Sequence, residues 1–215
     1  MPAIRVLRKR RGTELLFYPK HLIPKADKEL FLRLVDPNPQ IRYKASNVIW
    51  HIGKIREAVE FLRKIDFSRI PLNYFDAGDR RMSSYFMKLI KEAISKKNYF
   101  MHRGVPVYII ERLEDKLHVK GTMEFCRALI PEEVKGRNKE ETQIFREIVA
   151  EHELTHFFTL NQDFAYIMEL RYAFEKGKLN EWLKYASTYF RYPNLRLNPI
   201  VKYYPEIAEK ITVWK

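Results

Sequence analysis

The motif His152-Glu-Leu-Thr-His156 carries the most recognisable chemistry in the sequence. On a helix its two histidines project from the same face one turn apart and can bind a single Zn²⁺ ion, while Glu153 activates the water on that ion. Such a site needs a third ligand, for which Glu169 and Glu175 are the candidates. Without a third ligand, the same histidines would be ordinary buried or half-buried residues of a helix flank.

Residues 117–125 alternate between apolar and polar side chains, the pattern of a strand with one face in the core. His118 and Lys120 fall on the polar face, and Glu111 lies at the end of the preceding β-branched segment. A histidine and a carboxylate close to a base are groups that hold a divalent ion against a phosphate. The pattern therefore predicts a second candidate metal site, with an ordinary solvated strand face as the alternative.

Tyr185 and Tyr189 are four residues apart in a helical pattern at residues 179–190, so their hydroxyl groups project from one side of that helix. A phenol can attack a metal-polarised phosphodiester and form a covalent phosphotyrosine. A second tyrosine one turn away can accept the strand in a later transfer. The alternative is that both rings belong to an aromatic stripe of the core.

The elements that must position these residues follow from hydrophobic periodicity. Helical spacing predicts an amphipathic basic helix through Val48, Ile52, Ile55, Val59 and Leu62, and a second helix over residues 84–97. Strands are expected at 67–74, 105–110 and 117–125, with the last two forming a hairpin. Three more helices are expected at 139–158, 164–176 and 179–190. This order of elements predicts the α+β fold class.

The chain is strongly basic, with 40 lysine and arginine residues, 27 aspartate and glutamate residues and a net charge of +13. A charge of this size favours a polyanionic partner, either nucleic acid or an anionic membrane. The sequence has no run of about 20 apolar residues and no signal-peptide pattern at its start, which argues against the membrane. Cys126 is the only cysteine, so no intrachain disulfide forms, and we expect a cytoplasmic protein that binds nucleic acid.

Two groups of basic residues are the candidate nucleic-acid contacts. The first is a block of like charge that we expect to form an arm reaching a phosphate backbone: Arg5, Arg8, Lys9, Arg10 and Arg11. The second lies on the expected basic helix and comprises Lys54 and Arg56. The alternative is that the positive charge only keeps the protein soluble.

Three segments together resemble the rolling-circle replication initiators of the HUH endonuclease family: Ile70-Pro-Leu-Asn73, Tyr108-Ile-Ile-Glu111 and Leu117-His-Val-Lys-Gly-Thr-Met-Glu124. The resemblance covers residues 67–192. It implies a ferredoxin-like antiparallel sheet with helices, a bound Mg²⁺ or Mn²⁺ ion, and nicking of single-stranded DNA at an origin.

The resemblance also implies roles for single residues. His118 and Glu111 would be the metal ligands, and one of the two tyrosines of the later helix would be the nucleophile. Two positions depart from the family pattern: Lys120 stands where a second metal-binding histidine is expected, and Thr188 stands where a lysine often follows the tyrosine. Because a lysine is cationic and repels a metal ion, these departures favour a DNA-binding protein that kept the fold and lost the chemistry.

The motif that begins at His152, taken alone, resembles a gluzincin-type metalloprotease, but proteolysis does not explain the basic arm or the net charge. We therefore expect, first, an HUH-type initiator that binds DNA and can nick it. The alternatives are a zinc metallopeptidase and a DNA-binding protein without activity. The expected organisation is a basic arm with a helical extension at 1–66, an HUH-like α+β domain at 67–192 and a tail at 193–215.

Overall fold

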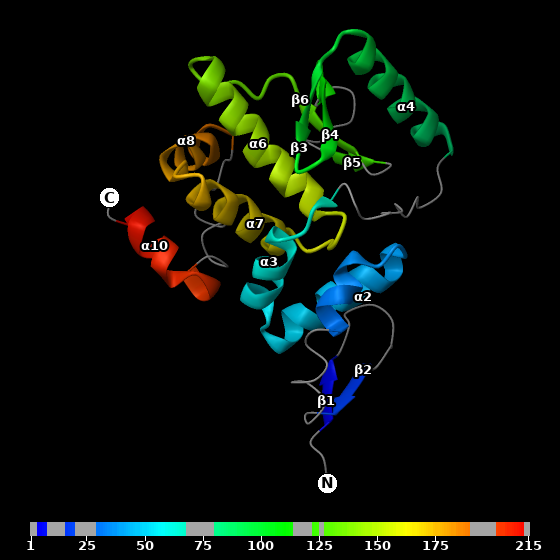
Figure 1. Ribbon diagram of the computed structural model, residues 1–215, viewed down its shortest axis with the longest axis vertical. Helices are drawn as coiled ribbons and strands as arrows, with labels where there is room; N and C mark the ends of the chain where they lie inside the picture. Colours follow the sequence, from blue (N-terminus) through cyan, green and yellow to red (C-terminus); the bar gives the residue numbers. More distant parts are fainter. Residues whose placement is uncertain are drawn as a thin grey trace.

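The computed structural model describes residues 4–7, 16–19, 29–67, 80–113, 122–124, 127–189 and 201–212 of the chain. Its main helices are α2 (Pro39–Ile52), α3 (Ile55–Arg63), α4 (Arg80–Ser95), α6 (Lys139–Thr155), α7 (Gln162–Glu175), α8 (Leu179–Tyr189) and α10 (Pro205–Thr212), with a short 3-10 turn η2 (Arg33–Val35). Its strands are β1 (Ile4–Leu7), β2 (Leu16–Pro19), β3 (Tyr99–His102), β4 (Val105–Ile110), β5 (Thr122–Glu124) and β6 (Arg127–Pro131). The fold is mixed α+β and mostly helical, as expected from the sequence (Figure 1).

The main sheet has four strands in the order β3-β4-β6-β5. β4 pairs with β6 in parallel, whereas β3 with β4 and β5 with β6 are antiparallel. The expectation of a purely antiparallel sheet is therefore wrong. The expected hairpin between residues 105–110 and 117–125 is also wrong, because β4 lies between β3 and β6 and the described part of the second segment, β5, is an edge strand.

The actual hairpin joins β3 to β4 through a two-residue turn. Its central residues, Arg103 and Gly104, have φ angles of 49° and 77°, the left-handed conformations of a type I′ turn. This turn type matches the twist of the flanking strands, so it sets the register that pairs His102 with Val105. β3 was not predicted, because its four residues are too few to show a periodic pattern.

Helices cover both faces of the sheet, with α4 on one side and α6 on the other (Figure 1). Successive residues of β4 point to opposite faces. Tyr108 and Ile110 pack in the cluster that includes α4 residues, while Val107 and Ile109 pack in the larger cluster that includes α6. β4 is therefore buried on both faces, and the apolar stripe predicted for residues 84–97 does face the core.

The helices predicted at 139–158, 164–176 and 179–190 are confirmed as α6, α7 and α8. Asn138 and Asn161 cap the first two, each accepting backbone N–H groups of the first turn at 2.9 Å. The expected single basic helix is instead two helices, α2 and α3. The chain turns at Gly53, whose φ of 76° closes α2 with a left-handed cap.

The basic segment near the start of the chain contains a strand. β1 pairs antiparallel with β2, and Arg5 lies in β1 opposite Tyr18. The expected arm is thus part of a two-stranded ribbon where it is described. The other basic residues of this group, Arg8, Lys9, Arg10 and Arg11, lie outside the described residues.

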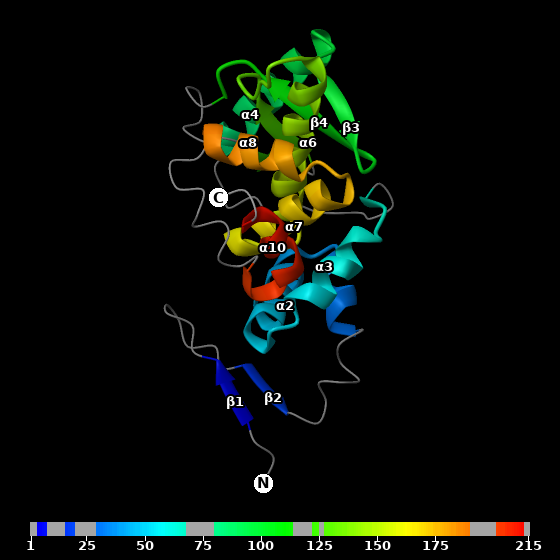
Figure 2. The same ribbon diagram turned by 90° about the vertical axis from the view of Figure 1, so that its left-hand side faces the viewer.

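One buried cluster extends from Leu30 to Ile211 and unites α2, α3, α6, α7, α8, α10 and one face of the sheet. Figure 2 shows α10 in front of α7 and beside α3. Arg56 of α3 binds Glu206 of α10 at 2.6 Å, and Lys210 of α10 lies 4.7 Å from the ring centre of Phe174 in α7. The helices before residue 67 therefore share a core with those after it. None of the described helices is long and apolar enough to cross a membrane.

Candidate functional site

The motif histidines lie where the end of α6 faces α7. His152 is in the last turn of α6 and His156 is its C-cap residue, with their ring centres 5.1 Å apart. Three residues of α7 face them at positions i, i+4 and i+7, a spacing that places side chains on one face of a helix. Gln162 approaches His156 with 3.2 Å between their Nε2 atoms, and the Tyr166 ring lies 5.3 Å from the His152 ring. Glu169 completes this face of α7.

Glu169 links the first histidine to the core. Its Oε2 atom accepts a hydrogen bond from Nδ1 of His152 at 2.9 Å, and its Oε1 atom accepts one from Nε1 of Trp182 at 3.2 Å. The carboxylate is fully buried, and His152 is 8% exposed. A buried carboxylate bound to the Nδ1 atom is the usual arrangement behind a metal-ligating histidine, because it fixes the ring and leaves Nε2 as the acceptor nitrogen.

The site runs from the surface into the core. Gln162 is exposed, His156 and Tyr166 are half-buried, and Glu169 lies at the bottom. Glu153, which the motif assigns to proton transfer, is 8% exposed. Glu169 was a predicted ligand, whereas Gln162 and Tyr166 were not predicted; their helical spacing from Glu169 is the sequence signal that marks them.

The protonation of His156 follows from its surroundings. Its Nδ1 atom lies 3.1 Å from the carbonyl oxygen of Thr159, which can only accept, so Nδ1 carries the proton. Burial lowers the pKa of His156 from 6.5 to about 4, and the neighbouring His152 lowers it further in the same direction. At neutral pH this imidazole is uncharged and its Nε2 atom is an acceptor, as a metal ligand must be.

The low pKa of His156 predicts that the metal-free protein loses stability in acid. The unfolded chain takes up this proton near pH 6.5 and the folded chain only near pH 4, so the unfolded state binds more protons between these values. Relative to His156→Gln, wild type should therefore lose about 3 kcal/mol of its free energy of unfolding as the pH drops through this window. Urea unfolding of both proteins at several pH values measures it, and a pH-independent difference would contradict the shift.

The two candidates for the third ligand have different environments. Glu169 binds His152 of the motif. Glu175 instead forms ion pairs with Arg63 and Arg171. Among the residues that the structure describes, no group of three histidine, cysteine, aspartate or glutamate side chains is arranged to hold a metal ion as the side chains stand. The histidines and Glu169 are thus neighbours that do not yet converge on one point.

Glu151, the residue before His152, is also held by side-chain contacts at both of its carboxylate oxygens. Glu151 is 2% exposed, with Nε2 of His102 at 2.8 Å from one oxygen and a guanidinium nitrogen of Arg103 at 2.8 Å from the other. Burial acts to raise the pKa of Glu151, but the hydrogen bond from His102 and the charge of Arg103 outweigh it and hold the pKa below its usual value. The carboxylate is therefore charged at neutral pH.

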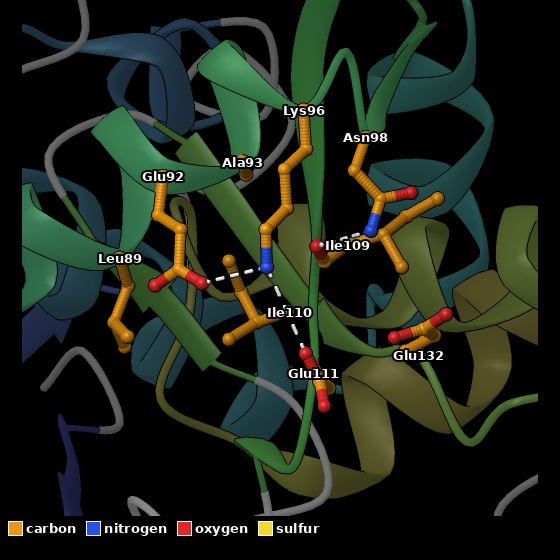
Figure 3. Close-up of a pocket in the computed structure, with 9 residues that line it drawn as sticks. All are labelled: Leu89, Glu92, Ala93, Lys96, Asn98, Ile109, Ile110, Glu111 and Glu132. Atoms are coloured by element: carbon orange, nitrogen blue, oxygen red, sulfur yellow. Dashed lines mark hydrogen bonds and ion pairs between the residues drawn. The ribbon is translucent and has the colours of Figure 1, made fainter.

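The other predicted metal site is described only in part. Glu111 follows β4 and is exposed, with Oε2 at 3.7 Å from Nζ of Lys96. It lines a pocket of about 210 Å³ between α4 and β4, together with Glu92 and Glu132 (Figure 3). Lys96 is held within this pocket by Glu92 at 2.8 Å, so a cation already pairs with two of its three carboxylates. His118 and Lys120 lie outside the described residues.

The predicted nucleophiles lie on α8. Tyr185 is 5% exposed, and its ring packs against Phe145 of α6 with 5.7 Å between ring centres. This burial favours the core role over attack on a DNA strand. The side chains of Tyr189 and Thr188 are outside the described part of the chain.

The predicted nucleic-acid contacts on α3 and just before it are engaged within the protein. Lys54 binds Glu57 at 3.2 Å. Arg56 binds Glu206 at 2.6 Å and lies over the ring of Tyr204 at 5.0 Å. These exposed pairs are weak, about 1 kcal/mol or less, so a phosphate can compete for either cation.

Comparison with known proteins adds no relative: no family model, no curated protein and no solved structure matches the chain. A function must therefore be inferred from the geometry of α6 and α7.

Proposed function

We propose that the protein is a zinc-dependent metallopeptidase with its active site between α6 and α7. The observation that supports the proposal best is the 2.9 Å contact between Glu169 and Nδ1 of His152. It brings a buried carboxylate from the next helix to the first histidine of a His-Glu-x-x-His motif. Two histidines and one glutamate are the donors of a well-known class of catalytic zinc sites.

His152 and His156 would hold the zinc ion through their imidazoles, and Glu169 would be the third ligand. Because the three side chains do not converge in the structure, Glu169 would have to exchange its contact with His152 for the metal. Because Glu169 binds Nδ1, whereas Nε2 is the free acceptor nitrogen of this ring, its carboxylate would have to leave Nδ1 and reach the ion on the other side of the imidazole.

When bound, zinc supplies a water molecule of lowered pKa and polarises the substrate carbonyl. The protein's own contribution is proton transfer. Glu153 follows His152 directly, and its carboxylate would accept a proton from the attacking water and later donate it to the leaving amine. Tyr166 and Glu169 hold the first imidazole from the side of α7, and substrate would enter past Gln162, the exposed residue of this face.

Peptidase activity with an unfolded, fluorescently labelled protein as substrate tests the proposal. We expect hydrolysis that 1,10-phenanthroline abolishes and that added Zn²⁺, but not Mg²⁺, restores. Hydrolysis that survives the chelator would contradict the proposal, as would the absence of hydrolysis in a zinc-loaded sample.

Nucleic-acid binding is a second candidate function, favoured by the net charge of +13. Each phosphate contact releases counterions, so affinity for single-stranded or duplex DNA should fall by about 10³-fold or more between 50 and 200 mM salt if about six contacts form. Fluorescence anisotropy at several salt concentrations measures the slope, and an affinity that does not change with salt would exclude electrostatic binding. The HUH initiator hypothesis, with its ferredoxin-like core and Mg²⁺ or Mn²⁺ ion, is supported only by the sequence resemblance.

A further inference from the structure

Arg103 occupies a backbone position that disfavours arginine. Its φ of 49° lies in the left-handed region, where a side chain with a Cβ atom is strained. At this first central position of a type I′ turn, asparagine, aspartate and glycine are the usual residues, and Gly104 follows it as expected. The turn itself therefore does not explain why the residue is arginine.

The contacts of the side chain explain it. One guanidinium nitrogen donates to Glu151 of α6 at 2.8 Å. The other donates to three carbonyl oxygens at and after the end of α3, at 2.6, 3.1 and 3.1 Å: those of Leu62, Arg63 and Ile65. The guanidinium also lies 3.9 Å from the ring centre of Phe67. A single side chain thus connects the β3–β4 turn, the end of α3 and the last turns of α6.

Glu151 stands next to the candidate zinc site in the chain. Neighbouring residues of a helix project about 100° apart, since one turn contains 3.6 residues. Glu151 faces the β3–β4 turn and binds Arg103 and His102, while His152 faces α7 and binds Glu169. The rotation of this part of α6 about its axis is therefore fixed from two sides.

Stability alone does not account for this arrangement. Desolvation offsets much of the attraction in a buried ion pair, and apolar residues of similar volume often stabilise a protein as well or better. What charged groups add is a defined geometry, because a guanidinium and a carboxylate bind in fixed directions. Strained backbone positions that are held by such contacts are also concentrated at functional sites.

We propose that Arg103 is a positioning residue of the candidate zinc site. Through Glu151 it holds the turn of α6 that carries His152 and Glu153 in the orientation that metal binding requires. The inference rests on the proposed function, and it adds to it a residue from the β3–β4 turn that the metal-binding motif does not contain.

The variant Arg103→Asn tests this role with little damage to the turn, because Asn-Gly is the preferred type I′ sequence. We expect zinc to bind up to about ten-fold more weakly, at the low end of the cost of losing a direct partner of a metal ligand, because Arg103 acts only through Glu151. Competition with a chromophoric chelator measures the affinity at a temperature where circular dichroism shows folded protein. Arg103→Lys keeps a cation for Glu151 and should recover part of the affinity. The matched control Arg33→Asn removes an exposed arginine that pairs with Glu29, and it should bind zinc as wild type does.

Nuclear magnetic resonance of the histidine side chains separates this inference from the proposed function. In metal-free Arg103→Asn, the ¹⁵N signals of His152 should shift while those of the exposed His51 stay unchanged. A wild-type protein without zinc affinity would refute the peptidase, whereas unchanged His152 signals, or wild-type zinc affinity in Arg103→Asn, would overturn the positioning role. If this variant does not fold, the double variant Arg103→Asn, Glu151→Gln removes both charges and should show the same His152 shift.

Discussion

Replacing Glu153 with glutamine should lower kcat for peptide hydrolysis by about 10³-fold while the protein keeps its zinc. Glutamine has the shape of glutamate but cannot accept a proton from the attacking water. The variant removes the general base and leaves the imidazoles of His152 and His156 in place. Zinc content and kcat, measured on the same preparation, give both halves of this result.

The control is Glu140→Gln, which makes the same change of charge in the first turn of the same helix. Glu140 is exposed and pairs with Lys178 at 3.6 Å, away from the motif, so we expect wild-type activity. Equal losses of kcat in both variants would indicate an effect of the net charge of α6 and not a specific role of Glu153. Full activity in Glu153→Gln would exclude Glu153 as the base.

Replacing Glu169 with glutamine should weaken zinc binding by more than 100-fold. The single amide oxygen can still accept a hydrogen bond from Trp182 while the amide NH2 group donates to Nδ1 of His152 in its other tautomer, so the variant should fold, but it lacks the anionic oxygen that a zinc ion prefers. A role limited to holding the ring of His152 would cost only about ten- to a hundred-fold. Titration of zinc against a chelator of known affinity therefore distinguishes a ligand from a residue that only orients His152.

The chain offers a matched control six residues further along α7. Glu175 was the other candidate for the third ligand, and it is bound by Arg63 and Arg171. Glu175→Gln should destabilise the protein slightly and leave zinc affinity unchanged. The reverse pattern, with zinc lost in Glu175→Gln and kept in Glu169→Gln, would show that the ligand has been misassigned.

The long helices of this protein were predictable from sequence because their apolar residues repeat with helical period over several turns. That regularity gave α6, α7 and α8 to within a few residues, and with α6 it placed both motif histidines on one face. The break at Gly53 was harder to see, because apolar residues continue at helical spacing from Val48 to Leu62 across it. Only the backbone conformation of the glycine divides the two helices.

The sheet was predicted less well. Periodicity identifies a strand but not its neighbours, so the order β3-β4-β6-β5 and the parallel pairing of β4 did not follow from the pattern. One signal was available: residues 105–110 are nearly all apolar, as expected for a strand covered on both faces. Such a strand is expected in a sheet that is covered by helices on both faces, rather than in an antiparallel sheet with one solvated face.

The net charge does not by itself identify a partner. A formal charge counts cations without showing their contacts, and several of them stabilise the fold. Arg42 donates to three backbone carbonyls from a fully buried position, and Arg103 and Arg171 bind buried or half-buried glutamates. The sequence also could not show which of Glu169 and Glu175 lies near the motif histidines, because that depends on which face of α7 packs against α6.

Zinc content measured by mass spectrometry is the most direct test of the account. Full-length wild-type protein, loaded with zinc and passed through gel filtration, should retain a single zinc ion per chain. His152→Gln and His156→Gln should each retain none, while His51→Gln, which changes an exposed histidine of α2, should retain the wild-type amount. A wild-type protein without zinc, or histidine variants that keep it, would contradict the metallopeptidase.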